Sequence, residues 1–430
     1  MKDRALVAIV AISILLLPTL SYVSFVGFLV VIGVMAFRAP RAMASFWWRE
    51  GFVLVALGLI LSTLLAYDRS VAYVQLANFL PFMGVTAALA VWLGNSSQPF
   101  RYLEDWAAWF LVISVPVNLF AVLEYILMAP AVRTTLGTTP GFRLFYEHNY
   151  DFGHRADLLF GSPNALACYL GFVFALGLGL LLSHCLVKRC PLGTDLGAKS
   201  KVVGWLYKPG GRLGTVTFLN LVGLFCTGSR NGILVTGAIF VISLWSIPQG
   251  KGLKRACAWG LGALLLCTIG FGMGGRKLSG AIFTQDPRLG VWRIAWDYAL
   301  QHPWFGIGLG NYRLLYPPEA VPGYVEMPHA HNLWLMLVSE AGFPVAIALT
   351  LIVGWTLYRG VRILPTLPPQ HRAIALGYYW AFISLTLFSV FDLTIAYPRT
   401  TLLGWFTLGC IYGILRYRSQ LGQLNQFGGS

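Results

Sequence analysis

Long apolar segments alternate with short polar connectors along almost the entire chain. The apolar segments run for roughly 16 to 25 residues, and each is long enough to cross the ~30 Å hydrocarbon core of a bilayer as a helix. The segments are continuous rather than alternating, which favours helices over the strands of a membrane barrel. The pattern therefore predicts an all-α, polytopic membrane protein.

The boundaries of the apolar segments predict about twelve transmembrane helices in a single domain, residues 1–430. Residues 5–37 are expected to form a hairpin of two short helices that turns at Pro18 and Thr19. The other predicted helices are 50–66, 71–93, 106–128, 163–186, 213–227, 233–247, 256–273, 331–357, 373–391 and 400–415.

Two long polar interruptions divide this pattern, a small loop at 129–162 and a large loop at 274–330. Within the large loop, residues 288–300 are predicted to form an amphipathic helix that lies in the membrane interface. Leu289, Trp292, Trp296 and Ala299 lie on one face of this helix at helical spacing.

The charge pattern orients the chain. The formal net charge is +15, although only 11% of the residues are charged. The strongly basic connectors all fall on one side of the predicted membrane, which is cytoplasmic by the positive-inside rule. The N-terminus is then inside and both long loops are outside, and the excess charge faces anionic lipid rather than nucleic acid.

Several arginines lie outside, against this bias: Arg230, Arg276, Arg288, Arg293 and Arg313. The planar guanidinium fork suits phosphate oxygens, so a lipid-linked pyrophosphate at the outer leaflet would suit such a cluster. For Arg230, between Gly228 and Gly232, the alternative is an arginine that reaches the lipid headgroups.

Histidines are concentrated where the large loop re-enters the membrane, at Pro328–Asn332. Either His329 or His331 is a candidate general base, because nearby cations would lower the histidine pKa and keep the ring neutral. The alternative is an interfacial histidine that only satisfies hydrogen bonds. There is no P-loop, no paired carboxylates at metal-ligand spacing and no paired-cysteine motif, so neither a metal nor a cofactor is expected.

Four motifs occur in order in the second half of the chain: SRNG at 229–232, R-x4-R-x2-W at 288–296, HPWFGIGLGNY at 302–312 and HAHNLWLMLVSEAG at 329–342. Together they resemble the O-antigen ligase family, which also includes O-antigen polymerases and protein O-oligosaccharyltransferases. The resemblance implies a metal- and ATP-independent glycosyltransferase. It would move a glycan from undecaprenyl pyrophosphate to lipid A–core oligosaccharide, with inversion, at the periplasmic face of the inner membrane.

The resemblance also implies roles for individual residues. His331 would be the base that deprotonates the acceptor hydroxyl, and Arg230 and Arg288 would hold the pyrophosphate. The further substrate-binding candidates are Arg293, His329, Asn332, Arg313 and Trp292. Val345 departs from the family pattern, which weakens assignment to the lipopolysaccharide ligase branch.

Two other functions stay open at this stage. A polymerase of the same family would differ only in its acceptor. A transporter of bicarbonate or another small anion would need ionisable or helix-breaking residues at the membrane midplane, and none is evident. In the small loop, Arg143, His148 and His154 face the same side as the large loop and are candidates for contact with the acceptor.

Overall fold

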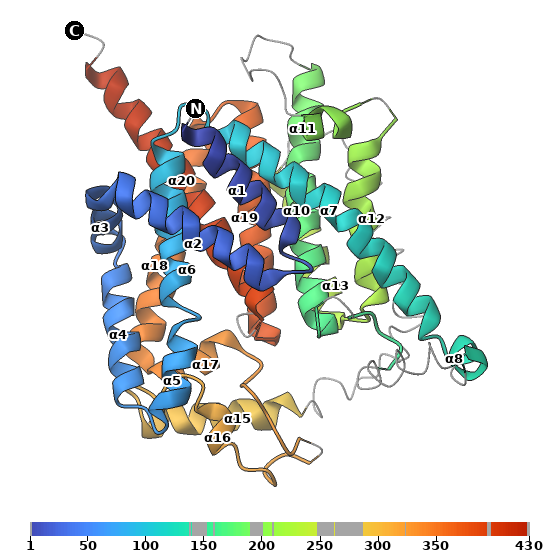
Figure 1. Cartoon of the computed structure of the whole chain (residues 1–430), viewed down its shortest axis with the longest axis vertical. Helices are drawn as coiled ribbons and strands as arrows, with labels where there is room; N and C mark the ends of the chain where they lie inside the picture. Colours follow the sequence, from blue (N-terminus) through green and yellow to red (C-terminus); the bar gives the residue numbers. More distant parts are fainter. Residues whose placement is uncertain are drawn as a thin grey trace.

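A computed structural model describes residues 2–136, 139, 153–157, 160–189, 201–208, 210–246, 262, 287–322, 324–393 and 397–427. Within these residues the secondary structure is helical throughout, without strands (Figure 1). The helices are α1 (Lys2–Leu16), α2 (Ser21–Arg38), α3 (Pro40–Arg49), α4 (Phe52–Leu64), α5 (Arg69–Leu76), α6 (Leu80–Gly94), α7 (Pro99–Leu127), α8 (Pro130–Leu136), α10 (Pro163–Arg189), α11 (Lys201–Leu206), α12 (Arg212–Cys226), α13 (Arg230–Ser246), α15 (Arg288–Gln301), α16 (Tyr312–Leu315), α17 (Leu333–Ala341), α18 (Phe343–Ile363), α19 (Pro369–Phe391) and α20 (Pro398–Phe427).

Several of these helices are long and apolar enough to cross a membrane. Among the described residues there are 6 such spans, or 7 if the bent pair α3 and α4, which meet at 78°, is counted as one span. Shorter apolar helices are Arg4–Leu16, Arg212–Cys226 and Arg230–Leu244. The protein is therefore a multi-pass helical membrane protein, while the total of about twelve stays a prediction. The predicted helix 256–273 lies outside the described residues except for Gly262.

The segment predicted as one helix over 331–357 is instead broken at Gly342 into α17 and α18. Gly342 has a φ of 83°, and a Cβ there would lie 2.3 Å from the carbonyl oxygen of Trp304. The turn after α15 packs into the break, where the amide of Phe343 donates to the carbonyl of Pro303 at 2.8 Å. The predicted helix 71–93 contains a short break between α5 and α6, but Arg69–Gly94 is still one candidate span.

Helix α15 confirms the predicted helix at 288–300, but Ala299, which was predicted to face the membrane interface, is buried in the protein. Val291, Ala295 and Ala299 are buried, at a spacing of four residues, against a small core beneath α15 and α16. Leu289 and Trp296 are 47% and 45% exposed. The small residues face the protein because α15 packs closely on α17, and the larger apolar side chains Leu289 and Trp296 are left exposed.

Helices α10 and α19 lie side by side and antiparallel through the middle of the molecule (Figure 1). At Gly179 and Gly377 their backbones meet, because a Cβ on Gly179 would lie 2.5 Å from the Cα of Gly377. Small residues at a helix contact permit such close approach in membrane proteins. The start of α10 and the end of α19 are thereby held together at one end of the bundle.

The two ends of the bundle differ in chemistry. Helices α5, α15 and α16 lie at the lower end in Figure 1, whereas α11 lies in the upper part and α3 lies above α4 on the left. Arg359 of α18 pairs with Glu50, which directly follows α3, and Arg418 of α20 donates to the hydroxyl of Thr366. The functional residues of the large loop are therefore far from the basic connectors.

Candidate active site

His331 and Asp392 form a hydrogen-bonded pair at the lower end of the bundle. The Nδ1 atom of His331 lies 2.9 Å from Oδ1 of Asp392, and the two side chains are 20% and 6% exposed. Asp392 directly follows α19 and His331 lies just before α17. A carboxylate on Nδ1 places the ring proton there and leaves Nε2 as the basic nitrogen.

The backbone around His331 is unusual. His331 has a φ of 50°, the only positive value at a non-glycine residue in the described part of the chain. Its neighbour Asn332 caps α17 by accepting from the amides of Trp334 and Leu335 at 2.9 and 3.1 Å, and its Nδ2 donates to the carbonyl of Val390 at 2.9 Å. These contacts tie His331 to the end of α19. Strained backbone held in this way is common at functional sites.

The environment keeps Asp392 ionised. Burial would raise the pKa of its carboxyl, but the hydrogen bond from His331 and the charges of His331 and Arg288 outweigh burial and lower the pKa to about 2. The Leu393 amide also donates to Oδ1 at 2.8 Å. A carboxylate of this kind stabilises a positive charge on His331 after proton uptake.

A polar network extends from Asp392 to the SRNG turn between α12 and α13. Asn164 Nδ2 donates to Asp392 Oδ2 at 2.5 Å, while Asn164 Oδ1 accepts from Ser229 Oγ at 2.9 Å. Arg155 Nη2 donates to the same Oδ1 at 3.2 Å, and Arg155 Nε donates to the carbonyl of Thr227 at 2.8 Å. Segments that are distant in sequence therefore meet at Asn164.

The sequence explains the geometry of the SRNG turn. Gly228 has a φ of 58°, and Ser229 then caps α13 because its Oγ accepts from the amide of Gly232 at 3.2 Å. A Cβ on Gly232 would lie 2.8 Å from Cβ of Ala167, so glycine lets α13 approach α10. Arg230 is half-buried in the first turn of α13, where a cation opposes the helix dipole and an anionic ligand would offset it.

The other predicted arginines occupy different positions. Arg288 is half-buried and its Nη1 donates to the carbonyl of Phe391 at 2.9 Å, which places it beside the His331–Asp392 pair. Arg293 and Arg313 are more peripheral: Arg313 is exposed, Arg293 lies one and a half turns further along α15, and Arg276 lies outside the described residues. The indole N–H of Trp292 is buried without a hydrogen-bond partner among the described residues.

His329 differs from His331 in its accessibility. It is 7% exposed, and its Nδ1 accepts from the backbone amide of His331 at 3.3 Å. Burial and the charge of His331 lower the pKa of His329 to about 4, so its ring is neutral at neutral pH. Of the two histidines, His331 has the carboxylate partner that a general base requires.

His329, His331 and Asp392 also form the one group of potential metal ligands among the described residues, with ligand atoms within 4.8 Å of one another. However, Nδ1 of His331 is engaged by Asp392, and Nδ1 of His329 by a backbone amide. Arg288 adds a positive charge beside the group. This donor set fits an oriented base better than a metal centre.

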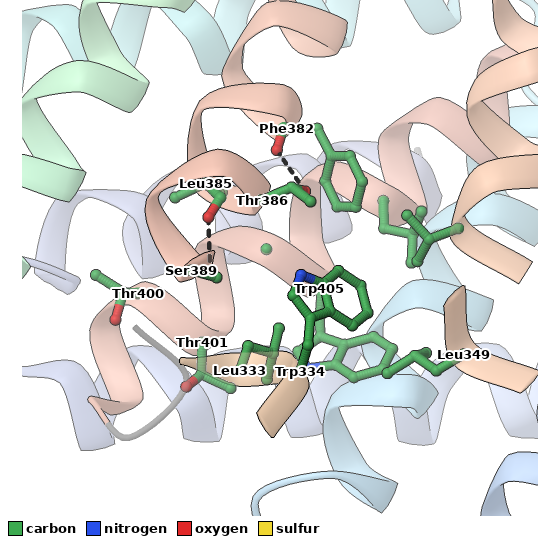
Figure 2. A pocket seen from close by; sticks show the side chains of 13 residues that line it. Leu333, Trp334, Leu349, Phe382, Leu385, Thr386, Ser389, Thr400, Thr401 and Trp405 are labelled. Carbon is green, nitrogen blue, oxygen red and sulfur yellow. Dashed lines mark hydrogen bonds between the residues drawn. The ribbon is translucent and has the colours of Figure 1, made fainter. Parts of the chain in front are cut away.

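Two cavities adjoin the pair. The first is apolar and lies between α17, α18, α19 and α20; Leu333, Trp334, Ser389 and Trp405 are among its lining residues (Figure 2). The second, of about 320 Å³, is more polar. Its lining includes Gln75, Asn78, Arg313, His329 and Glu340.

His331 and Asp392 line neither cavity themselves, but their chain neighbours line both. Residues just before His331 line the polar cavity, and residues just after it line the apolar one. Around Asp392 the order is reversed, with Ser389 at the apolar cavity and Leu393 at the polar one. The pair is therefore connected to both cavities through neighbouring residues.

Glu340 secures the glycine-rich turn at 306–312 behind the polar cavity. Its carboxylate accepts from the amides of Gly310 and Tyr312 at 2.8 and 3.3 Å. Burial raises the pKa of this carboxyl to about 7, against the two backbone amides, which favour the ionised form. A Cβ on Gly306 would lie 2.3 Å from the carbonyl carbon of Glu340, so the turn can pack on α17 only with glycine there.

The remaining predicted contacts lie in the small loop. His154 stacks on Tyr125 at a ring distance of 3.9 Å, and its Nε2 lies 2.8 Å from the carbonyl of Tyr125. Arg143 and His148 lie outside the described residues.

Asp392, Asn164 and Arg155 were not among the predicted site residues. The available signal was a polar residue directly after a span, for Asp392, and at a helix start, for Asn164.

The fold and site define a multi-pass helical membrane protein with an arginine-flanked histidine–carboxylate pair at one end. Residues 215–350 match the protein-family model described as O-antigen ligase, which confirms the resemblance to the O-antigen ligase family. That family is one of membrane glycosyltransferases. The matched region contains Arg230, Arg288 and His331, while Asn164 and Asp392 lie outside it. No curated protein matches the chain significantly.

Proposed function

We propose that this protein transfers a glycan from undecaprenyl pyrophosphate to a hydroxyl of lipid A–core oligosaccharide, as an O-antigen ligase. The observation that carries the proposal is the His331–Asp392 pair beside Arg288. His331 and Arg288 lie within residues 215–350, the region that matches the O-antigen ligase family model. The positive-inside pattern supports an inner-membrane location with this site facing the periplasm.

The proposed reaction is a single in-line displacement. Nε2 of His331 takes the proton of the acceptor hydroxyl as its oxygen attacks the anomeric carbon. The bond from that carbon to the pyrophosphate oxygen breaks, and the electron pair leaves with undecaprenyl pyrophosphate. Arg288 and Arg230 offset the charge of the leaving group, and Asp392 stabilises the protonated His331. The anomeric configuration is inverted.

The apolar cavity has the chemistry of a site for the polyprenyl chain. Two of its hydroxyl groups bond to carbonyls of their own helix: Thr386 donates to Phe382 at 2.9 Å and Ser389 to Leu385 at 2.8 Å (Figure 2). The cavity therefore presents mainly hydrocarbon and indole surface. It shares the last turns of α19 with the Arg288 contact at Phe391, so a prenyl group one phosphoester from the pyrophosphate can enter it.

The polar cavity has the chemistry of a site for the acceptor sugar. An in-line displacement requires nucleophile and leaving group on opposite sides of the anomeric carbon, which two separate cavities near the pair would allow. Replacing Gln75 by alanine together with Arg313 by glutamine should raise KM for the acceptor roughly tenfold, because the amide of Gln75 and the charged guanidinium of Arg313 are lost. KM for the donor should be unchanged.

Steady-state kinetics with each substrate varied in turn measures this effect. Gln301→Ala, at the exposed end of α15, is the matched control and should leave both KM values unchanged. An equal rise of the donor KM in the double variant would assign the polar cavity to the donor sugar instead.

Incubation of the purified protein with undecaprenyl-pyrophosphate glycan and lipid A–core, without ATP, tests the function itself. The expected result is a lipid A–core band of higher mass on a gel and release of undecaprenyl pyrophosphate. Longer chains on the donor would identify a polymerase. Absence of any product from properly folded protein would contradict the proposal and leave transport of a small anion to be tested in vesicles.

A further inference from the structure

We propose that Asn164 is a positioning residue that sets the catalytic carboxylate and the arginine-bearing turn relative to each other. This rests on the proposed function of the His331–Asp392 pair. Asn164 is in the first turn of α10, distant in sequence from both elements, and its amide joins them through 2.5 and 2.9 Å hydrogen bonds.

The chemistry of the contact requires an amide. Asp392 Oδ2 needs a donor, and Asn164 Nδ2 supplies it. Ser229 Oγ and Arg155 Nη2 both donate to Asn164 Oδ1, so this atom must be an acceptor. Among the small polar side chains, only asparagine offers a donor and an acceptor in this fork geometry.

Through this amide, the orientation of His331 is linked to the turn that carries Arg230. Asp392 fixes the ring of His331, and Ser229 caps α13 directly before Arg230. Both positions depend on the same side chain. Arg155 holds that side chain in place from the small loop, since it also binds the carbonyl of Thr227. This is a role for the end of loop 129–162.

Replacing Asn164 by aspartate tests the proposal, because a merely structural role of Asn164 would not give the pH dependence of activity expected here. The new carboxylate keeps the size of the amide but lies against Asp392. When both carboxylates are ionised they repel each other and Oδ2 loses its donor; when the introduced group is protonated, its hydroxyl can donate as the amide did. The activity of Asn164→Asp relative to the wild type should therefore rise as the pH is lowered.

The charged and titratable groups that face Asp392 or Asn164 in the described structure come from several elements. They are His329, His331, Arg288, Cys168, Tyr397 and Arg155. All of them are present in both proteins, so the ratio of the two pH profiles isolates the effect of residue 164.

The test is kcat for glycan transfer between pH 6 and 8 in the wild type, Asn164→Asp and Asn164→Ala. At pH 8 both variants should lose about 10- to 100-fold in kcat, as is typical when the partner of a catalytic group is removed. Only Asn164→Asp should recover towards pH 6. Asn220→Ala is the matched control: it removes a buried amide that pairs with Asn118, between α12 and α7, and should keep the wild-type kcat.

Wild-type kcat in folded Asn164→Ala, or the same pH profile in Asn164→Asp and the wild type, would overturn the proposal. If Asn164→Ala does not fold, Ser229→Ala replaces it, with an expected smaller loss of kcat and an unchanged pH profile. Inactivity of the wild type itself would contradict the proposed function instead, so the two failures are distinguishable.

Discussion

Replacing His331 by alanine is expected to reduce kcat for glycan transfer by about 10²- to 10⁴-fold, the usual contribution of a positioned general base. The donor should bind as before, because the arginines remain. Asp392→Asn should also reduce kcat, since an amide no longer fixes the tautomer or stabilises the protonated ring. Both variants should remain folded, with an unchanged elution profile in size-exclusion chromatography.

His302→Ala is the control for this prediction, because His302 is an exposed histidine of the same loop. It should transfer glycan at the wild-type rate. Transfer by purified His331→Ala at the wild-type rate would remove His331 as the base. His329 would then be the next candidate, and its low pKa would require activity to persist at mildly acidic pH.

The second large effect is expected at Arg288. Arg288→Ala should lower kcat/KM for the donor by about 10²- to 10³-fold, the range seen when a group that stabilises transition-state charge is removed. Lysine should restore only part of the rate, because an ammonium group cannot form the paired hydrogen bonds of a guanidinium. Initial rates at varied donor concentration measure both effects.

Arg293→Ala is the matched control, on the same helix and with the same loss of charge. Arg288 contacts the end of α19 directly, whereas Arg293 lies further along α15. Since the predicted role of Arg293 is only a supporting one, its loss should cost much less. Equal losses in both variants would indicate that general positive charge, rather than the placement of Arg288, attracts the donor.

Much of the fold could be predicted from apolar segment lengths, but the breaks could not. The hairpin of α1 and α2 is at its predicted place, with its turn at Pro18 and Thr19. The break at Gly342 was not predicted because residues 331–357 remain apolar across it. It depends on a turn some forty residues upstream that packs against Gly342, and hydropathy does not record such a contact.

The candidate site, like the fold, could be predicted from the sequence only in part. Arg288 and His331 were predicted from their residue types and motifs, and the structure brings both beside the end of α19. Asp392 lies 61 residues from His331, and Asn164 lies 228 residues from Asp392. Neither contact can be recognised from the spacing of these residues in the sequence. Each arises from the topology of α10 and α19, which local sequence does not reveal.

The glycine contact between α10 and α19 has a consequence for chemistry at the membrane surface. Gly179 and Gly377 each lie fifteen residues along the chain from Asn164 and Asp392, which is about 22 Å at the rise of an α-helix. The contact between α10 and α19 is therefore equally far from the two residues that form the hydrogen bond at the end of the bundle. A methyl group added at Gly179 would push α10 and α19 apart at their contact. The 2.5 Å hydrogen bond between Asn164 and Asp392 would then lengthen although no residue of the site had changed.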